Sequence, residues 1–394
     1  MSASASEPVL ILGGGLMGLA IAHALARRGV AVQVISRRRS EAAGFVAAGM
    51  LAPHAEGLRG DLLALGQASL ARVPAWVATI EADSGLSCGL RPCGIVVPFR
   101  SAAERDSYPT ASWGETLDRT GLEREVPGIG PGWPTGLLFA QDGQIDNRRR
   151  LMRALERACV SLGVRFQEGS EVLGLERQGP DGPLAAIRLR SAEGEEQRLA
   201  AQRAVLACGA WSARLLPQLP VVPVKGQMLS LQGPRRALQR VIFGPGTYLV
   251  PRSDGLLVVG ATSEPTAGFS EGLTPDGQRQ LQQGIAELLP AASGWPPMER
   301  WWGFRPCTPD EGPLLGSGPV PGLWLATGHH RNGVLLAAIT AELLAAAVAA
   351  GGAAGGDNTG QAPAGDAEPT RPGSSVPAAD WLQAFRWDRF DRSR

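Results

Sequence analysis

The residues with the clearest chemical potential are three glycines, Gly13, Gly15 and Gly18, spaced as G-x-G-x-x-G. The apolar run "PVLIL" precedes them, and a helical pattern leads from them into a second apolar run, "VAVQVIS". The first glycine permits a tight turn, the second lets backbone approach a pyrophosphate, and the third lets helix and strand pack closely. The helix N-terminus offers free N–H groups and partial positive charge to phosphates. In this strand–turn–helix–strand context the motif predicts dinucleotide binding.

The end of the second apolar run leaves the type of nucleotide open. A dinucleotide fold usually carries an acidic residue there for the ribose hydroxyls, but this chain has Ser36, followed by Arg37, Arg38 and Arg39. One interpretation is an NADP site whose arginines hold a 2′-phosphate. The other is a solvated basic loop beside a ribose held by the serine hydroxyl and backbone.

A second chemical segment is "GHHRNG", residues 328–333, between an apolar strand pattern and a long apolar helix pattern. Adjacent histidines point in different directions, and only two other histidines exist in the chain, so we predict no metal site. The segment instead leads into a helix whose N-terminus can stabilise negative charge.

Two further residues suit carboxylate recognition. Arg305 in "GFRP" offers a planar fork of two parallel donors, and Tyr248 offers a phenolic donor. Taken alone, the two residues are better explained as a surface strand arginine and a core tyrosine. Lys225 in "PVKGQ" receives no chemical role, because a strand lysine is usually solvated.

The elements that must position these residues come from alternating pieces of chain. With 394 residues, 44% of them hydrophobic, two or three domains are expected. Strand-rich segments at 86–99 and 221–262 interrupt the α/β segments. The Gly-, Ala- and Pro-rich stretch 350–379 predicts a flexible linker. The aromatic end "DWLQAFRWDRFDRSR" predicts a segment that docks back on the body of the protein or on a neighbour.

Composition excludes several classes of function. Lys plus Arg (38) nearly balances Asp plus Glu (37), which gives no electrostatic case for nucleic acid or an acidic membrane surface. Five cysteines without a C-x-x-C pair indicate neither a disulfide framework nor a zinc site. No signal-peptide pattern is present, and the apolar run 334–350 is short for a membrane span of about 20 residues. A reduced, cytoplasmic interior without membrane contact fits best.

Longer segments carry a family resemblance: "VAAGMLAPHAE" (46–56), "CGAWS" (208–212), "PVKGQMLSL" (223–231), "YLVPRSDGLLVVGAT" (248–262), "WWGFRPCTPDEGPLLG" (301–316) and "GHHRNG". As an ordered set, they resemble the glycine oxidases of the thiazole branch of thiamine biosynthesis, within the D-amino-acid oxidase and sarcosine oxidase superfamily. The resemblance implies an α/β fold (α+β overall), with a Rossmann-type FAD-binding domain interleaved with an antiparallel or mixed β-sheet substrate domain. The implied boundaries are 1–85, 145–220 and 300–350 for the FAD-binding domain, 86–144 and 221–299 for the substrate-binding domain, 351–379 for the linker and 380–394 for the docking segment.

The resemblance implies noncovalent FAD rather than a nicotinamide. Ser36 departs from the glutamate usual in the family, and the three arginines then become solvated residues. Cys307 immediately precedes Thr308-Pro309-Asp310, too close for the covalent flavin linkage of sarcosine oxidases. The implied cofactor contacts are Gly13, Gly15, Leu16, Met17, Gly18, Ser36, Arg37, Gly44, Ala48, Gly49, Met50, Val172, Gly209, His329, His330, Arg331, Asn332, Gly333, Val334 and Leu335.

The implied reaction is oxidation of glycine with water and O2 to glyoxylate, ammonia and H2O2, through an iminoacetate that feeds thiazole assembly by a thiazole synthase. Tyr248, Arg305 and Arg331 would bind the substrate carboxylate, hydride would pass from Cα to the flavin, and no side-chain base is expected. Sarcosine and D-alanine should also react, because one methylene is worth only ~1–3 kcal/mol. A homo-oligomer is expected. The alternatives are a related dehydrogenase with a non-oxygen acceptor, an NADP-dependent reductase and a non-enzymatic interaction protein.

Overall fold

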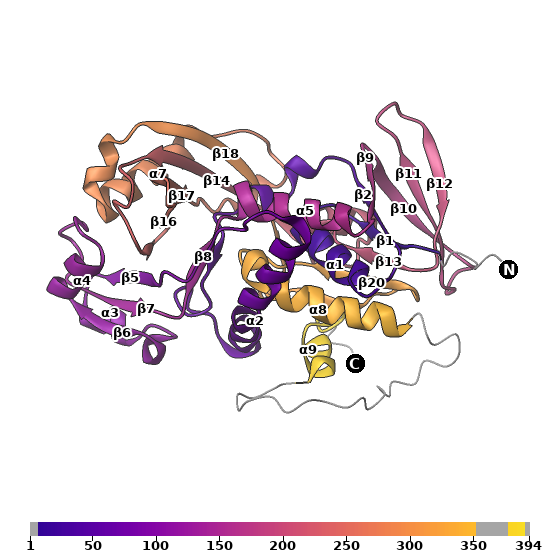
Figure 1. The fold of residues 1–394 in the computed structure, drawn as a ribbon, viewed down its shortest axis with the longest axis horizontal. Coiled ribbons are helices and arrows are strands. Elements are labelled where there is room, and N and C mark those ends of the chain that lie inside the picture. The colour runs from indigo at the N-terminus through magenta and orange to yellow at the C-terminus, as the bar shows by residue number, and fades with distance from the viewer. Residues whose placement is uncertain (1–6, 352–376, 391–394) are drawn as a thin grey trace.

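The computed structural model describes residues 7–351 and 377–390, and its described strands form two large sheets and two small ones (Figure 1). The six-stranded sheet has the order β19-β20-β13-β1-β2-β9. Its strands are β1 (Val9–Leu12), β2 (Val32–Ser36), β9 (Arg165–Glu168), β13 (Ala204–Leu206), β19 (Leu314–Ser317) and β20 (Leu323–Thr327). All pair in parallel except β19, which runs antiparallel to β20. This arrangement confirms the α/β fold class.

The central strand β1 is buried on both faces, which explains its continuous apolar run. Val9 and Ile11 enter a core shared with the helices, whereas Leu10 and Leu12 enter a core shared with the small sheet β10-β11-β12. The strands of that small sheet are β10 (Glu171–Arg177), β11 (Leu184–Arg190) and β12 (Glu196–Ala200).

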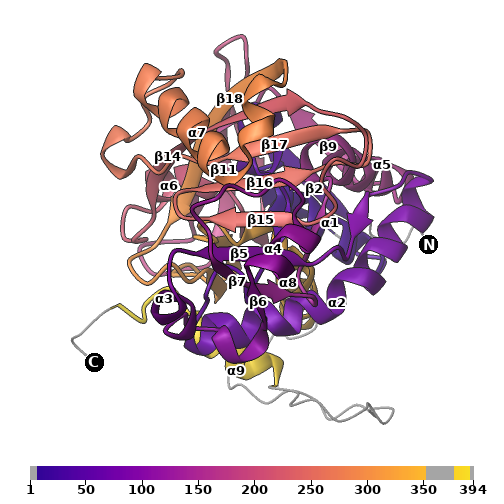
Figure 2. The same ribbon diagram turned by 90° about the vertical axis from the view of Figure 1, so that its left-hand side faces the viewer.

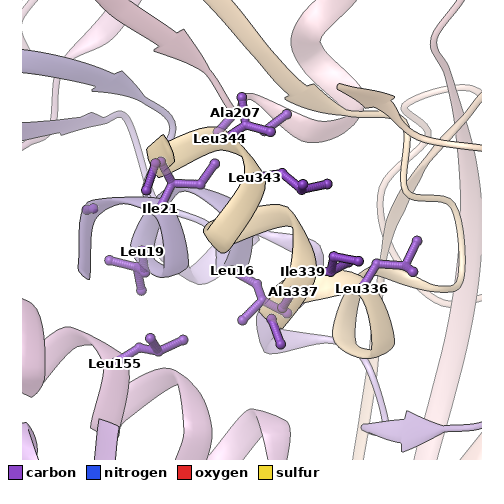
Figure 3. Packing of buried hydrophobic residues seen from close by; sticks show 14 of the residues in the cluster. Leu16, Leu19, Ile21, Leu155, Ala207, Leu336, Ala337, Ile339, Leu343 and Leu344 are labelled. Carbon is purple, nitrogen blue, oxygen red and sulfur yellow. The ribbon is translucent and has the colours of Figure 1, made fainter. Parts of the chain in front are cut away.

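Four helices build the core on the other face. They are α1 (Leu16–Ala26), α2 (Gly60–Ser84), α5 (Met152–Ser161) and α8 (Gly333–Gly351). Figure 3 shows Leu16 of α1 close to Ala337 and Ile339 of α8, and Leu19 of α1 facing Leu155 of α5. Among the described residues, α8 is the one helix long and apolar enough to cross a membrane, but 67% of its most apolar window is buried inside the protein. Its apolar composition is therefore accounted for by packing.

The eight-stranded sheet has the order β18-β14-β17-β16-β15-β5-β7-β6, and Figure 2 shows its strands side by side. Its pairs are antiparallel apart from β15 with β5, so the predicted mixed sheet is confirmed. Its strands are β5 (Ile95–Phe99), β6 (Glu115–Asp118), β7 (Thr135–Phe139), β14 (Val222–Gln232), β15 (Val241–Gly244), β16 (Thr247–Pro251), β17 (Leu256–Gly260) and β18 (Pro297–Cys307).

Short elements complete the described fold. A small sheet of β3 (Met50–Leu51), β8 (Gly143–Ile145) and β4 (Leu90–Arg91) lies at the junction of the large sheets. The remaining helices are α3 (Ala102–Asp106), α4 (Arg119–Glu125), α6 (Ser212–Leu215), α7 (Pro275–Leu288) and α9 (Ala378–Ala384).

Two of the predicted boundaries fall within elements of the structure, β18 and α9. The predicted boundary at residue 300 falls within β18, which pairs with β14 of the eight-stranded sheet. The predicted linker, 351–379, lies mostly outside the described residues, but α9 begins within it at Ala378.

Candidate functional site

A cavity of about 640 Å³ is lined by residues of both large sheets. One part of its wall comes from the turns that follow β1, β2, β13 and β20, and the opposite part comes from β14, β16 and β18. In open parallel sheets, ligands bind outside the carboxyl ends of the strands, and this cavity lies there.

The glycine turn between β1 and α1 forms one end of the cavity. Gly13 has a φ of 111°, and a Cβ on it would lie 2.4 Å from the carbonyl oxygen of Ala207. A Cβ on Gly18 would lie 1.9 Å from the carbonyl oxygen of Gly13, which explains the third glycine as a close-packing residue. α1 has no side-chain cap at Gly15 and no acidic residue in its first turn. Its free N–H groups therefore face a cavity without competition from a carboxylate, as an anion site requires.

The arginines after β2 all have acidic partners. Arg37 and Arg38 donate to Glu41, each at 2.6 Å. Arg39 pairs with Glu156 and Glu168 and stacks over the ring of Phe166. A 2′-phosphate would have to displace these carboxylates, so the geometry disfavours the NADP interpretation. Ser36 is buried at the end of β2 and lines the cavity.

A buried arginine, Arg252, holds the backbone of residues 48–49, just before β3. Gly49 has a φ of 85°, and a Cβ on it would lie 2.0 Å from the carbonyl oxygen of Ile145. Arg252, 5% exposed, donates to the carbonyl of Ala48 at 2.5 Å. The backbone of this segment is thereby held along the cavity wall, next to Met50.

The turn from β20 to α8 brings the two adjacent histidines to the cavity. Burial lowers the pKa of His329 to about 3 and that of His330 to about 4, so both are neutral near pH 7. His329 Nε2 lies 3.1 Å from Thr340 Oγ1. No cluster of three potential metal ligands occurs among the described residues. Buried Asn332 has a side-chain nitrogen without a hydrogen-bond partner in the described structure, but Asn332 does not line the cavity.

Arg305 and Tyr248 lie at the other end of the cavity, on β18 and β16. Two glycines in the strands between them make room: a Cβ on Gly226 would meet Arg305 Nη1 at 2.4 Å, and a Cβ on Gly260 would meet the Tyr248 hydroxyl at 2.5 Å. Arg305 donates to the Thr262 carbonyl at 3.1 Å. Burial raises the pKa of Tyr248 to about 12, against an opposing effect of Arg305, so the phenol keeps its proton.

Arg331 differs from Arg305 because carboxylates already neutralise it. Its Nε lies 3.0 Å from Glu56 Oε2, and its Nη2 lies 3.6 Å from Glu311 Oε2. The Glu56 side chain is 5% exposed, and burial raises its pKa to about 7. Among the described residues, this end of the cavity thus holds one arginine without a carboxylate partner, Arg305, and one carboxyl group whose pKa lies near neutrality, Glu56.

Most of the residues predicted from sequence line this cavity; the exceptions are Gly18, Asn332 and Leu335. Five further residues line the cavity that were not predicted from the sequence: Glu41, Glu56, Met228, Thr262 and Glu311. Glu56 and Glu311 lie inside segments quoted for the family resemblance, but nothing in the sequence separates them from surface acids.

Comparison with known proteins gives consistent matches. Residues 8–347 match the family described as FAD dependent oxidoreductase. A bifunctional protein ThiO/ThiG of Synechocystis sp. is 44% identical over 86% of this chain and 51% of its own; the chain thus spans about half the length of the curated ThiO/ThiG relatives it matches. Glycine oxidase of Pseudomonas aeruginosa is 31% identical over 86% of this chain and 94% of its own. The crystal structure of glycine oxidase from Geobacillus kaustophilus matches with a TM-score of 0.80 and 31% identity, covering 87% of this chain and 94% of that one.

Proposed function

The chain belongs to the family of FAD dependent oxidoreductases, and on this premise we propose that it oxidises glycine. Glycine and O2 would give iminoacetate and H2O2, and water would convert iminoacetate to glyoxylate and ammonia. The observation that carries the proposal is the Arg305–Tyr248 pair, which lies in the same cavity as an uncapped helix N-terminus. Similarity to glycine oxidases over most of the chain supports the choice of substrate.

The residues present fit FAD. The free N–H groups of α1 suit the pyrophosphate, and buried Ser36, which lines the cavity, lies where the ribose is expected. Cys307 is not among the residues that line the cavity, which supports a noncovalent cofactor. When bound, FAD supplies the acceptor for the two electrons of the amine and passes them to O2.

The chain's own residues bind and orient the amino acid. The Arg305 fork can donate two parallel hydrogen bonds to the substrate carboxylate, and the Tyr248 hydroxyl, with its high pKa, remains a donor. Glu56 offers a buried acceptor to the amino group of a zwitterion. Arg331, already paired with two carboxylates, contributes to the charge of the mouth more than to direct carboxylate binding.

The wider setting follows from the resemblance and from the names of the relatives. We propose that iminoacetate feeds thiazole assembly, since the bifunctional relatives join a ThiO part to a ThiG part. Sarcosine and D-alanine should also react, because a single methylene changes binding by only ~1–3 kcal/mol. The five cysteines are all unpaired, which fits a reducing, cytoplasmic compartment. A homo-oligomer remains part of the proposal.

The test is a visible spectrum of the purified protein before and after anaerobic addition of glycine. Flavin absorbance that bleaches with glycine and returns with air supports an oxidase. Bleaching that only an artificial acceptor reverses would replace the oxidase with a dehydrogenase. Flavin that bleaches with another amine, but not with glycine, would change the substrate and keep the reaction class.

A further inference from the structure

The C-terminal segment, residues 377–390, lies against the turn that carries Glu311. α9 packs on β19 and lies below α8 in Figure 1. Trp381 and Phe385 are buried, and the carbonyl of Phe385 accepts a hydrogen bond from the backbone N–H of Leu315 at 2.9 Å. The segment therefore has its own hydrophobic and backbone anchors, next to the 308–313 turn.

Arg389 makes the polar contacts between this segment and the turn. Its guanidinium binds both carboxylate oxygens of Asp310, at 2.8 Å each. It also donates to the carbonyls of Gly312 and Pro313 at 3.0 Å and to that of Arg386 at 2.9 Å. All five donors of the side chain are thereby used. A fully satisfied, largely buried guanidinium (13% exposed) is a specific connection and not a loose surface contact.

The opposite side of the same turn reaches the substrate end of the cavity. Asp310 also accepts from the backbone N–H of Gly312 at 3.0 Å, which tightens the turn around Glu311. Glu311 has a φ of 60°, a conformation that a non-glycine residue keeps only when its surroundings hold it there. Its carboxylate lies 3.6 Å from Arg331 and 3.7 Å from the ring of His330.

We propose that Arg389 is a positioning residue for the substrate site. By holding the 308–313 turn, it keeps Glu311 against Arg331 and so lowers the positive charge that the mouth of the cavity presents to an entering carboxylate. This inference deepens the proposed function, since it concerns recognition of an amino acid at that site. A zwitterion, with no net charge, is then favoured over a simple anion.

The direction of the effect follows from the charges. Without the Arg389 contacts, the strained backbone at Glu311 relaxes and its carboxylate withdraws from Arg331. Arg331 then keeps only Glu56, and anions bind more tightly. Because the Arg331–Glu311 pair is about half exposed, the expected gain is modest, about two- to five-fold.

The experiment measures the dissociation constant of acetate by saturation-transfer NMR on the acetate methyl signal, with the FAD-loaded full chain. Acetate is a carboxylate without an amino group, and this readout needs no turnover. Arg389→Ala and Glu311→Gln should each tighten acetate binding about two- to five-fold, and the double variant should show no further gain, because both act through one contact. In the glycine assay, KM should change while kcat stays within about two-fold. Arg386→Ala is the matched control: Arg386 lies in the same segment, and within the part of the chain that the structure describes its side chain pairs only with Asp388.

Three results would overturn the inference: an acetate dissociation constant unchanged in Arg389→Ala, additive effects in the double variant, or an equal shift in Arg386→Ala. If Arg389→Ala fails to fold, Arg389→Lys serves instead, since lysine keeps the charge but cannot hold both carboxylate oxygens and both carbonyls. Failure of glycine oxidation with the acetate pattern intact would sink the proposed substrate alone. The reverse result would sink only the positioning role.

Discussion

Arg305 lies directly over Gly226 of the neighbouring strand, so that a Cβ on this glycine would stand 2.4 Å from the guanidinium Nη1. The Arg305 guanidinium can therefore occupy its place in the cavity only because residue 226 has no side chain. The nearest obstacle to such a Cβ is the far end of a flexible side chain and not backbone, so the strand can accept it.

Gly226→Ala should accordingly reproduce much of the loss caused by removing Arg305, while the protein still folds and binds FAD. The methyl group displaces the guanidinium from its place, and kcat/KM for glycine should fall at least about tenfold, the equivalent of one lost charge-assisted hydrogen bond. Steady-state kinetics of Gly226→Ala, Arg305→Ala and the double variant check this. An additive loss in the double variant would show that the two residues act separately.

Arg305→Ala should lower kcat/KM for glycine by about 10- to 150-fold, since hydrogen bonds to charged groups contribute about 1.5–3 kcal/mol. Arg305→Lys should recover only part of this loss, because lysine keeps the charge but not the two parallel donors. Arg300→Ala is a matched control, exposed on the same strand β18. An Arg305→Ala enzyme with unchanged kinetics would revive the view of the chain as a protein that keeps the fold without the site.

Gly15→Ala should weaken FAD binding and leave the fold of the apoprotein intact. A Cβ here would meet only Ala42, at 3.3 Å, and Gly15 has an ordinary φ of −77°, so the cost lies where backbone must approach the cofactor. We expect at least a tenfold rise in the FAD dissociation constant and a melting temperature of the apoprotein within about 2 °C. Gly294→Ala, with open space around its Cβ, is the control.

Gly13→Ala should behave differently and compromise folding itself. Its φ of 111° is a conformation that L side chains rarely adopt, and its Cβ would meet the Ala207 carbonyl at 2.4 Å. The expected result is a loss of stability in the apoprotein as well as in the FAD-loaded protein, seen by thermal unfolding of both. If Gly13→Ala and Gly15→Ala destabilised the apoprotein equally, the separation of turn geometry from cofactor approach would be wrong.

Much of the scaffold was predictable because local patterns act over short distances. The strand–turn–helix–strand around Gly13 and the strand-rich segment 221–262 are confirmed, since glycine turns and apolar runs specify them within a few residues. The pairing of distant pieces, such as β14 with β18, follows from contacts between residues far apart in sequence, and no local pattern encodes it.

The charges at the site were less predictable, because burial decides them. The interpretation of Lys225 as a solvated strand lysine was wrong: it is 1% exposed and lies 3.8 Å from Glu264. Arg331 was expected to bind a substrate carboxylate, but two glutamates from distant segments approach it. The sequence indicates residue types, but only the fold shows which opposite charges meet.

The buried Glu56 carboxyl should make stability depend on pH. Burial raises its pKa from 4.5 to about 7, so between these values the folded protein holds a proton that the unfolded chain has released. The contribution of this group to the free energy of unfolding is therefore complete below about pH 4.5 and is lost as the pH rises to about 7. At 1.36 kcal/mol per pKa unit, the total is roughly 3 kcal/mol.

Glu56→Gln should remove this component, because the amide is neutral at every pH. The measurement is urea unfolding of both proteins at pH 5 and pH 8, with FAD present at a constant excess. Subtracting the variant from the parent cancels the other titrating groups, including Asp142, whose pKa burial also raises. Since part of the contribution is already lost at pH 5, this difference should fall by roughly 2.5 kcal/mol between the two pH values. A difference that stays constant would mean that Glu56 is ionised throughout, as a permanent partner of Arg331, and is not a carboxyl group that titrates near neutral pH.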